Sequence, residues 1–284
     1  MTTPSVIEFQ RLTIVGPGLL GGSIALAARE LCPQLHISVW ARRPETLQSV
    51  QEAGFADRCS LSLTEAVQDA DLVILTTPIE VMADLAEQMR PALRPDTLVT
   101  DVGSVKESVH QALKPLLGSA RWLGSHPMAG SEQSGLIAAR SDLFQGSVTI
   151  LTPDQDSPPE LCDVISRFWT ALGSRCVRLE PSRHDLLISD ISHLPHLMAA
   201  LLVLCVDEQS LPLAGPGFRD STRIAAGSPT LWREILLHNR QALLQSLDKL
   251  ALQASAARKL LEEADGPALE ALLAKACQKR KIPT

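Results

Sequence analysis

The first part of the chain alternates short apolar runs with segments whose apolar residues have helical spacing. The run at residues 71–76 is continuously apolar between its first and last residues, which is typical of a parallel strand buried on both faces. Alternating strands and helices predict a doubly wound parallel sheet. The predicted strands are residues 12–15, 36–40, 71–76 and 97–101, and the predicted helices are residues 24–31, 45–53, 62–70, 79–89 and one that starts at 105.

The alternation continues to about residue 180 and then stops. Residues 147–151 and 175–179 are two further predicted strands, with a helix at 159–172 between them, and we expect them to extend the first domain. The remainder is read as helical throughout: a helix over 184–208 kinked at Pro195, one over 229–265, and a last helix after Gly266. We therefore predict an α/β fold with a Rossmann-like dinucleotide-binding domain in residues 1–180 and an all-helical substrate and dimerisation domain in residues 181–284.

The predicted helical domain is rich in leucine at helical spacing. Helices this apolar need more cover than the domain itself provides, so we predict a homodimer formed through the C-terminal helices. Simple packing within one subunit is the alternative.

A glycine motif joins the first predicted strand to the first predicted helix. It has the form G-x-G-x-x-G, in which the first glycine permits a tight turn, the second lets a pyrophosphate approach the backbone, and the third lets the helix pack close to the sheet. The helix amino end then offers free N–H groups to phosphates. The motif predicts a dinucleotide site, with an ordinary strand-to-helix turn as the alternative; its residues are Gly16, Gly18, Leu19, Leu20 and Gly21.

The residues after the second predicted strand bear on the choice of cofactor. An acidic residue there suits the ribose of NAD, whereas an arginine suits the 2′-phosphate of NADP. This chain has Arg42 and Arg43 and no acid at that point. Guanidinium groups pair strongly with phosphate, so NADP is favoured over NAD. The alternative is that both arginines are solvated loop charges.

Further candidate residues follow the other predicted strands, where ligands of such sheets bind. Thr77 and Pro78 follow one strand and Gly103 and Ser104 the next, which places them near the nicotinamide. A helix N-cap explains Ser104 equally well. His126 lies in a loop at a strand tip and is a candidate general base, because the pKa of histidine is near neutrality; a structural histidine is the alternative.

Two other features of the sequence invite a functional interpretation. Glu132 is either a substrate contact or a solvated charge. His193 and His196 lie three residues apart on one helical face. No carboxylate or cysteine partner accompanies them, so we do not predict a metal site.

Composition narrows the class of protein. Hydrophobic residues make up 45% of the 284 residues and the net charge is −6, which predicts a substantial core and no nucleic-acid partner. Six scattered cysteines without a C-x-x-C pair fit a reducing cytoplasm. We expect no signal peptide, and the longest apolar run, 197–206, is too short to span a membrane.

Five segments together resemble the prephenate/arogenate (cyclohexadienyl) dehydrogenase family. They occur in the family's order and extend over nearly the whole chain; the third and fourth are specific, whereas the first occurs in many oxidoreductases. They are GPGLLGGS (16–23), DVGSVK (101–106), GSHPMAGSE (124–132), SHLPH (192–196) and FRDSTR (218–223).

The resemblance implies an NAD(P)-dependent oxidative decarboxylation and assigns roles to residues. His126 matches the catalytic histidine that takes the proton of the ring hydroxyl, and Ser104 matches the serine that bonds this hydroxyl and helps to orient the histidine. His196 matches a histidine of the substrate pocket. The other matches are His193 beside it, Ser125 and Glu132 in the third segment, Arg223 on a substrate carboxylate, and Arg219 at the pocket entrance, which the partner subunit can supply.

Three readings of the function stay open at this point. The first is the dehydrogenase just described, with prephenate and arogenate both possible as its substrate. Another two-domain dehydrogenase of the β-hydroxyacid or pyrroline-carboxylate reductase type is a second reading, although the former needs a catalytic lysine and none occurs between Lys114 and Lys249. A catalytically silent NADP-binding sensor is a third. Since the chain ends at Thr284, we expect no appended tyrosine-sensing domain.

Overall fold

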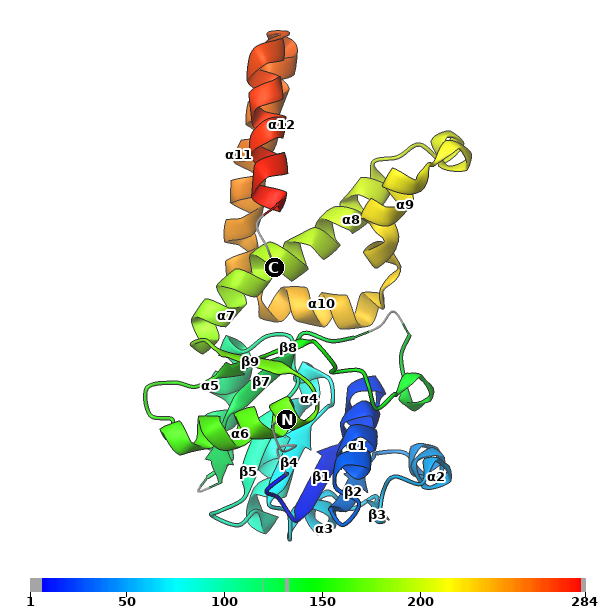
Figure 1. Ribbon diagram of the computed structural model, residues 1–284, viewed down its shortest axis with the longest axis vertical. Helices are drawn as coiled ribbons and strands as arrows, with labels where there is room; N and C mark the ends of the chain where they lie inside the picture. Colours follow the sequence, from blue (N-terminus) through cyan, green and yellow to red (C-terminus); the bar gives the residue numbers. More distant parts are fainter. Residues whose placement is uncertain (1–6, 119, 131–132, 282–284) are drawn as a thin grey trace, which may run out of the picture.

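The computed structural model describes residues 7–118, 120–130 and 133–281 and consists of two parts. In Figure 1 a layered α/β part lies below, and a helical part extends away from it in two arms. One arm is formed by α8 and α9, and the other is the hairpin of α11 and α12. The predicted fold class, a Rossmann-like sheet followed by a helical domain, is confirmed.

The α/β part contains a parallel six-stranded sheet in the order β3-β2-β1-β4-β5-β6. The chain order reverses between β1 and β4, and ligands of such sheets bind beyond the strand ends at this point. The strands are β1 (Arg11–Val15), β2 (His36–Trp40), β3 (Arg58–Ser60), β4 (Leu72–Leu75), β5 (Leu98–Asp101) and β6 (Arg121–Trp122).

Helices cover both faces of this sheet and give it two apolar cores. Residues of α1, α2 and α6 (Pro159–Ala171) belong to one core, and residues of α3, α4 and α5 belong to the other. The predicted stop of α2 at Gly54 is confirmed, because this glycine adopts the left-handed conformation with φ 71°. The helices are α1 (Leu19–Leu31), α2 (Pro44–Ala53), α3 (Leu63–Val67), α4 (Ile79–Met89), η1 (Arg90–Ala92) and α5 (Glu107–Leu116).

A second sheet of three strands lies beside the first. It consists of β7 (Gly124–Pro127), β8 (Val148–Thr152) and β9 (Arg175–Arg178) in that order. Strand β7 runs antiparallel to β8, whereas β8 and β9 are parallel. The two strands predicted after residue 146 therefore form a sheet of their own. The short helix η2 (Leu136–Ala138) connects β7 to β8 and packs on α1.

The helical part differs from its prediction at two points. The helix expected over 184–208 is a continuous stretch of α7 (Pro181–Ile188), the π-helical turn η3 (Ser189–His193) and α8 (Leu194–Leu204). The π-helical turn comes directly before the turn that contains Pro195, which has no N–H for an α-helical hydrogen bond. The helix expected over 229–265 is divided at Asn239. The remaining helices are η4 (Glu208–Leu213), α9 (Pro216–Thr222), η5 (Arg223–Ala226), α10 (Pro229–His238), α11 (Arg240–Glu262) and α12 (Gly266–Arg280).

The helical arms leave large apolar side chains uncovered. Leu204 at the end of α8 is 81% exposed, and Leu252 on α11 is 70% exposed. The continuous helical stretch Pro181–Leu204 is also long and apolar enough, by length and composition alone, to cross a membrane, and only 28% of its most apolar window is buried. One face of this stretch carries buried histidines, so we do not expect a membrane to surround it. Another apolar surface therefore has to cover its exposed face.

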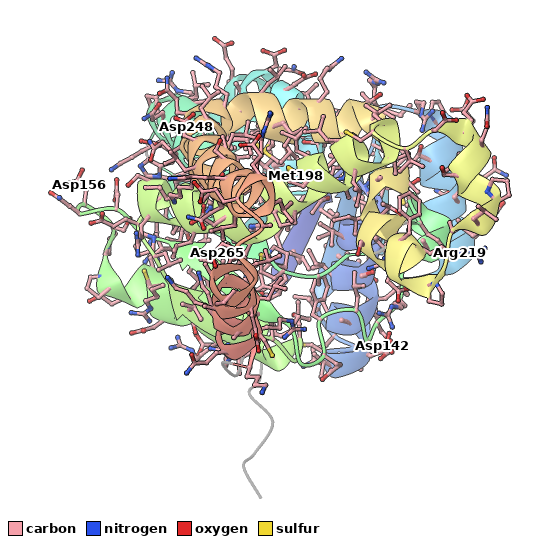
Figure 2. The ribbon with its side chains drawn as sticks, turned by 90° about the horizontal axis from the view of Figure 1, so that it is seen from above. Asp142, Asp156, Met198, Arg219, Asp248 and Asp265 are labelled. Carbon is pink, nitrogen blue, oxygen red and sulfur yellow. The ribbon has the colours of Figure 1, made fainter. Side chains whose placement is uncertain are left out.

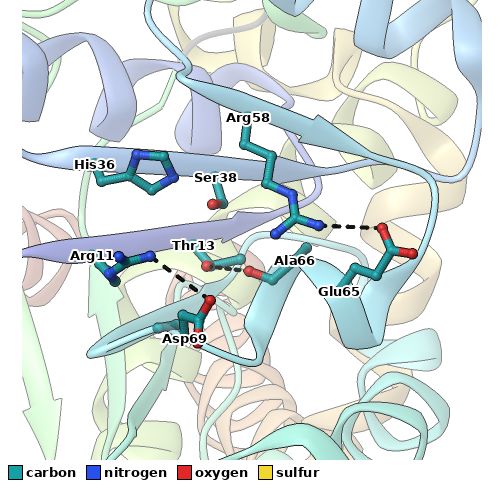
Figure 3. Close-up of a pocket in the computed structure, with 9 residues that line it drawn as sticks. Arg11, Thr13, His36, Ser38, Arg58, Glu65, Ala66 and Asp69 are labelled. Carbon is teal, nitrogen blue, oxygen red and sulfur yellow. Dashed lines mark hydrogen bonds and ion pairs between the residues drawn. The ribbon is translucent and has the colours of Figure 1, made fainter.

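A small cavity lies at the amino ends of β1, β2 and β3, as Figure 3 shows. Arg11, His36 and Arg58 line it at the first residue of each strand, and its volume is about 10 Å³. This is the edge of the sheet opposite to the glycine motif. The cavity is too small for a substrate and lies at the wrong end of the strands for a ligand site.

Candidate active site

The glycine motif forms an open cradle at the amino end of α1. Gly16 has φ +98°, and a Cβ at Gly21 would lie 2.7 Å from the carbonyl oxygen of Gly16, so neither position accepts a side chain without strain. A Cβ added at Gly18, by contrast, would have no described atom within 4 Å. Gly18 is the N-cap of α1 and has no side chain to cap the helix, so the first N–H groups of α1 are free to bind an anion. The cradle fits a pyrophosphate.

The two arginines of the cofactor prediction lie next to this cradle. Arg42 and Arg43 are both exposed and follow Ala41, the first residue after β2, which pairs with β1 along its whole length. The backbone N–H of Gly16 donates to the carbonyl oxygen of Trp40 at the end of β2, which joins the glycine turn to this strand end. Two exposed cations therefore follow the strand end to which the glycine turn is bonded.

The ends of the next two strands complete this edge of the sheet. A Cβ at Gly16 would lie 2.6 Å from Cγ2 of Thr77, and one at Gly103 would lie 3.4 Å from Cγ1 of Ile79. The structure thus brings Thr77, Pro78 and Gly103 together beside the glycine turn. The hydroxyl of Thr77 is buried without a hydrogen-bond partner among the described residues, as expected of a group that bonds to a ligand.

A buried ion pair joins β5 to the second sheet. The ammonium group of Lys106 donates to Asp101 and, at 2.9 Å, to the carbonyl oxygen of Ser125. Burial lowers the pKa of Lys106, and the charge of Asp101 opposes that shift. The Ser125 hydroxyl donates to the Asp101 carbonyl and accepts from Thr100 at 3.1 Å, and Ser125 is fully buried. The hydroxyl of Ser125 is therefore bonded to β5, and its predicted substrate contact stays a prediction.

His126 lies in β7, not in a loop as predicted, and pairs with Ile150 of β8. Its side chain is 7% exposed, and its Nδ1 lies 2.8 Å from Nε2 of His184 on α7. Burial first, and then the neighbouring ring of His184, the charge of Lys106 and the ring of His193, hold the pKa of His126 well below the ordinary value of 6.5. At neutral pH the imidazole is therefore neutral and has a lone pair with which to take a proton.

Asp185 of α7 reaches across to the amino end of α5. Its carboxylate accepts hydrogen bonds from the backbone N–H groups of Lys106 at 2.8 Å and Glu107 at 3.0 Å. Because the helix begins at Glu107 and Lys106 is its N-cap, the alternative reading of Ser104 as the N-cap is wrong. Ser104 is half-buried in the connection between β5 and α5. Its place on the edge where the ligand is expected agrees with a role in the site.

His193 and His196 lie on the same helical stretch as His184, and both are buried. The His196 ring stacks on Trp232 of α10 with 3.5 Å between the ring centroids, and the His193 ring meets the same indole edge-on. His196 Nδ1 and His193 Nε2 have no partner among the described residues. Burial lowers the pKa of His193 to about 4. Two neutral imidazoles thus have unused polar atoms, as in a pocket that binds a polar ligand.

The two predicted substrate arginines lie on the α8–α9 arm. Arg219 lies on α9 at the outer edge of the molecule in Figure 2, and Arg223 is the first residue of η5; both are exposed. Glu132 lies outside the described residues.

Sequence reasoning missed three residues of the site, namely His184, Asp185 and Asn239. The dipeptide His184-Asp185 opens the helical part and fits an ordinary helix, although two adjacent titratable residues on an apolar helix are a usable signal. Asn239 donates from its side-chain nitrogen to the carbonyl oxygen of Asp185 and to Nδ1 of His193, both at 2.9 Å. These bonds hold the junction of α10 and α11, which explains why a single long helix is the wrong prediction.

The chain is similar to known proteins over nearly its whole length. The family model described as prephenate dehydrogenase, nucleotide-binding domain, matches residues 24–178, and the one described as prephenate dehydrogenase, dimerization domain, matches residues 180–275. Cyclohexadienyl dehydrogenase of Zymomonas mobilis is 34% identical over 265 residues, which cover 91% of this chain and 90% of that protein. Prephenate dehydrogenase of Bacillus subtilis is 36% identical over 262 residues, covering 89% and 71%.

Solved structures agree with these matches. Prephenate dehydrogenase from A. aeolicus, in complex with hydroxyphenyl propionate and NAD+, has a TM-score of 0.89 at 29% identity and covers 95% of this chain and 97% of that one. Synechocystis arogenate dehydrogenase has a TM-score of 0.84 at 28% identity, covering 95% and 98%.

Proposed function

Because this chain belongs to the prephenate dehydrogenase family, we propose that it oxidatively decarboxylates prephenate to 4-hydroxyphenylpyruvate with NADP, as a step of tyrosine biosynthesis. The observation that carries the proposal is the buried, neutral imidazole of His126 in β7, next to Ser125, which bonds to Asp101 at the carboxyl end of β5. Arogenate, whose product would be tyrosine, is the second candidate substrate, since an arogenate dehydrogenase has nearly the same fold.

The proposed reaction combines a hydride transfer, a proton transfer to His126 and a decarboxylation. A bound nicotinamide supplies the acceptor for the hydride that leaves the ring carbon bearing the hydroxyl. His126 takes the proton of that hydroxyl, so that a carbonyl can form as the hydride departs. The carboxylate on the opposite ring carbon leaves as carbon dioxide, its bonding electrons make the ring aromatic, and the proton returns to the ring oxygen. The chain has to align the ring, hold its carboxylates and accept one proton.

The remaining residues are proposed for binding. Ser104 bonds to the reacting hydroxyl, while His193 and His196 offer unused nitrogen atoms to the polar groups of the substrate. Arg223 holds a substrate carboxylate, and Glu132 and Arg219 shape the entrance. Nucleotide contacts come from Gly16, Gly18, Leu19, Leu20, Gly21, Thr77, Pro78 and Gly103, with Arg42 and Arg43 on the 2′-phosphate.

We also propose that the enzyme is a cytoplasmic homodimer with domains at 1–180 and 181–284. The uncovered leucines of the helical arms support a dimer, as does the match of residues 180–275 to a dimerization domain. A second copy could place its α8–α9 arm, which carries Arg219, near the pocket of the first. All six cysteines are free, which agrees with a reducing compartment.

Steady-state assays of reduced nicotinamide, with each substrate paired with NADP or NAD, test this proposal. We expect a higher kcat/KM with NADP and with prephenate; oxidation of neither substrate would contradict the reaction. Removing Arg42 and Arg43 by alanine substitution should lower kcat/KM with NADP by about 10- to 100-fold and leave that with NAD nearly unchanged. The matched control is Arg175→Ala, an exposed arginine at the start of β9.

A further inference from the structure

Two side chains, those of His184 and Asp185, connect His126 to the amino end of α5 in a row of three. His126 Nδ1 lies 2.8 Å from His184 Nε2, and His184 Nδ1 lies 2.7 Å from Oδ1 of Asp185. The Asp185 carboxylate is itself fixed by the backbone N–H groups of Lys106 and Glu107. His184 is fully buried and Asp185 is 3% exposed, so the row is closed to solvent.

The chemistry of these groups gives every hydrogen bond in the row a direction. A carboxylate only accepts, so Nδ1 of His184 carries a hydrogen. Burial lowers the pKa of His184, although Asp185 opposes that shift, so the ring is neutral and its Nε2 has a lone pair. That lone pair faces Nδ1 of His126, which must therefore carry a hydrogen and donate it. In a neutral His126 the lone pair is then on Nε2.

We propose that Asp185 and His184 are positioning residues that hold His126 in the tautomer whose Nε2 accepts the substrate's hydroxyl proton. The inference rests on the function proposed above and adds to it two residues that the sequence motifs do not assign. Without a partner at Nδ1, a histidine side chain in water prefers the other tautomer, whose Nε2 is protonated and cannot act as a base. The hydrogen bonds from Asp185 through His184 therefore fix the tautomer of His126 before the substrate binds.

The same row also favours the charge that His126 acquires. When Nε2 takes the proton, the imidazolium donates from Nδ1 to the lone pair of His184, and the negative charge of Asp185 lies directly beyond. The cation of Lys106 and the ring of His193 also face His126, and both oppose protonation. Asp185 is therefore the carboxylate at the end of the row that counteracts them, and the apparent pKa of the base depends on it.

A second histidine of the site provides an internal comparison. His193 accepts at Nδ1 from the side chain of Asn239, whose nitrogen is identified by its other bond to the Asp185 carbonyl oxygen. Neutral His193 must therefore carry its hydrogen on Nε2. The structure thus assigns opposite tautomers to His126 and His193, and one spectrum can report both.

Nitrogen NMR of the full-length protein, labelled at its histidines and free of substrate, tests the inference directly. The chain contains seven histidines, so the ring nitrogens can be assigned with single substitutions. We expect His126 and His184 with the hydrogen on Nδ1 and His193 with the hydrogen on Nε2. A wild-type spectrum with His126 protonated on Nε2 overturns the inference.

Two variants connect the tautomer to turnover. His184→Phe keeps a buried ring but removes the acceptor, so His126 should change to the Nε2–H tautomer and kcat should fall about 10- to 1,000-fold with little change in KM. Asp185→Asn keeps the shape and removes the charge, so kcat should fall about 10-fold and its acidic limb should move to lower pH. Unchanged kcat and unchanged tautomers in folded His184→Phe would also overturn the inference.

The matched control is Asp190→Asn, in η3 five residues farther on. The Asp190 carboxylate accepts from Ser246 and Lys249 and has no histidine partner among the described residues, so its removal should leave the tautomers, kcat and pH profile unchanged. The outcomes separate the two proposals. An active wild-type enzyme with the wrong tautomer contradicts the positioning role alone. The expected tautomers in a protein that oxidises neither substrate support the row and contradict the proposed function.

Discussion

The two parts of the molecule differ in how they cover their apolar residues. All residues of β4 and β5 are buried, and two cores enclose the parallel sheet. In the helical part none of the residues of α12, all of which the structure describes, is buried, and α11 buries only Ala242, Leu243 and Ser246. The first part is thus complete as a single chain, whereas the second carries apolar surface that a single chain leaves in water.

The largest expected effect comes from placing a charge on an uncovered helical arm. Leu204→Glu removes an apolar side chain that a symmetric dimer would bury twice, which costs about 3–6 kcal/mol of association free energy. The dimer dissociation constant should rise about 10²- to 10⁴-fold. Light scattering across a dilution series measures it. Leu61→Glu is the control, because Leu61 is 54% exposed but lies in the nucleotide-binding part. Equal dimer dissociation constants for the two variants would contradict the difference between the two parts of the molecule.

A smaller effect is expected from one methyl group in the glycine cradle. A Cβ at Gly21 would lie 2.9 Å from Cγ2 of Ile14 as well as against the Gly16 carbonyl. Gly21→Ala should therefore lower the free energy of unfolding by about 1–3 kcal/mol and weaken nucleotide binding. Gly18→Ala, with open space around it, should weaken nucleotide binding while the free energy of unfolding changes by about 0.5 kcal/mol or less. Urea unfolding and nucleotide titration separate the two; equal destabilisation would show that the cradle is not as tight as described.

The acid stability of the first part depends on Asp154, between β8 and α6. Burial raises its pKa, but hydrogen bonds from Lys114 and Ser157 and nearby positive charge outweigh burial and lower the pKa from 3.8 to about 2. The stabilisation is thus complete above about pH 4 and is lost as the pH falls towards 2. Asp154→Asn should cost about 1–2 kcal/mol at pH 7 and much less at pH 2.

The neighbouring carboxylate is the control for this change. Asp156 also bonds to Lys114, at 3.0 Å, but its side chain is 84% exposed. Exposed pairs contribute little, so Asp156→Asn should cost about 0.5 kcal/mol or less at any pH. Urea unfolding at several pH values measures both variants, and a cost for Asp154→Asn that does not depend on pH contradicts the electrostatic explanation.

Local signals predicted the first part well. Helix α4 has the predicted bounds, β2 matches residue for residue, and Ser62, the first residue of the helix predicted over 62–70, caps α3 by accepting from the backbone N–H of Glu65. In each case the cause lies within a few residues of the effect. The strand, the turn and the cap can therefore be read from the chain alone.

The errors have causes that lie far away in the sequence. The break at Asn239 is held by bonds to residues 46 and 54 positions earlier, while the apolar spacing continues through it. The amino end of α5 is capped by Asp185, 79 positions later, where Ser104 was the local candidate. The partners of His126 were missed for the same reason. A motif identified the histidine, but His184 and Asp185, 58 positions later and beyond, reach it only in the folded chain.

The central claim is that His126 is the base, and its replacement tests that claim most directly. His126→Asn keeps a polar side chain but removes the titrating lone pair. We expect kcat to fall about 10²- to 10⁴-fold while the dissociation constant of the nucleotide stays within about twofold of the wild-type value. Near-normal turnover by this variant would contradict the account.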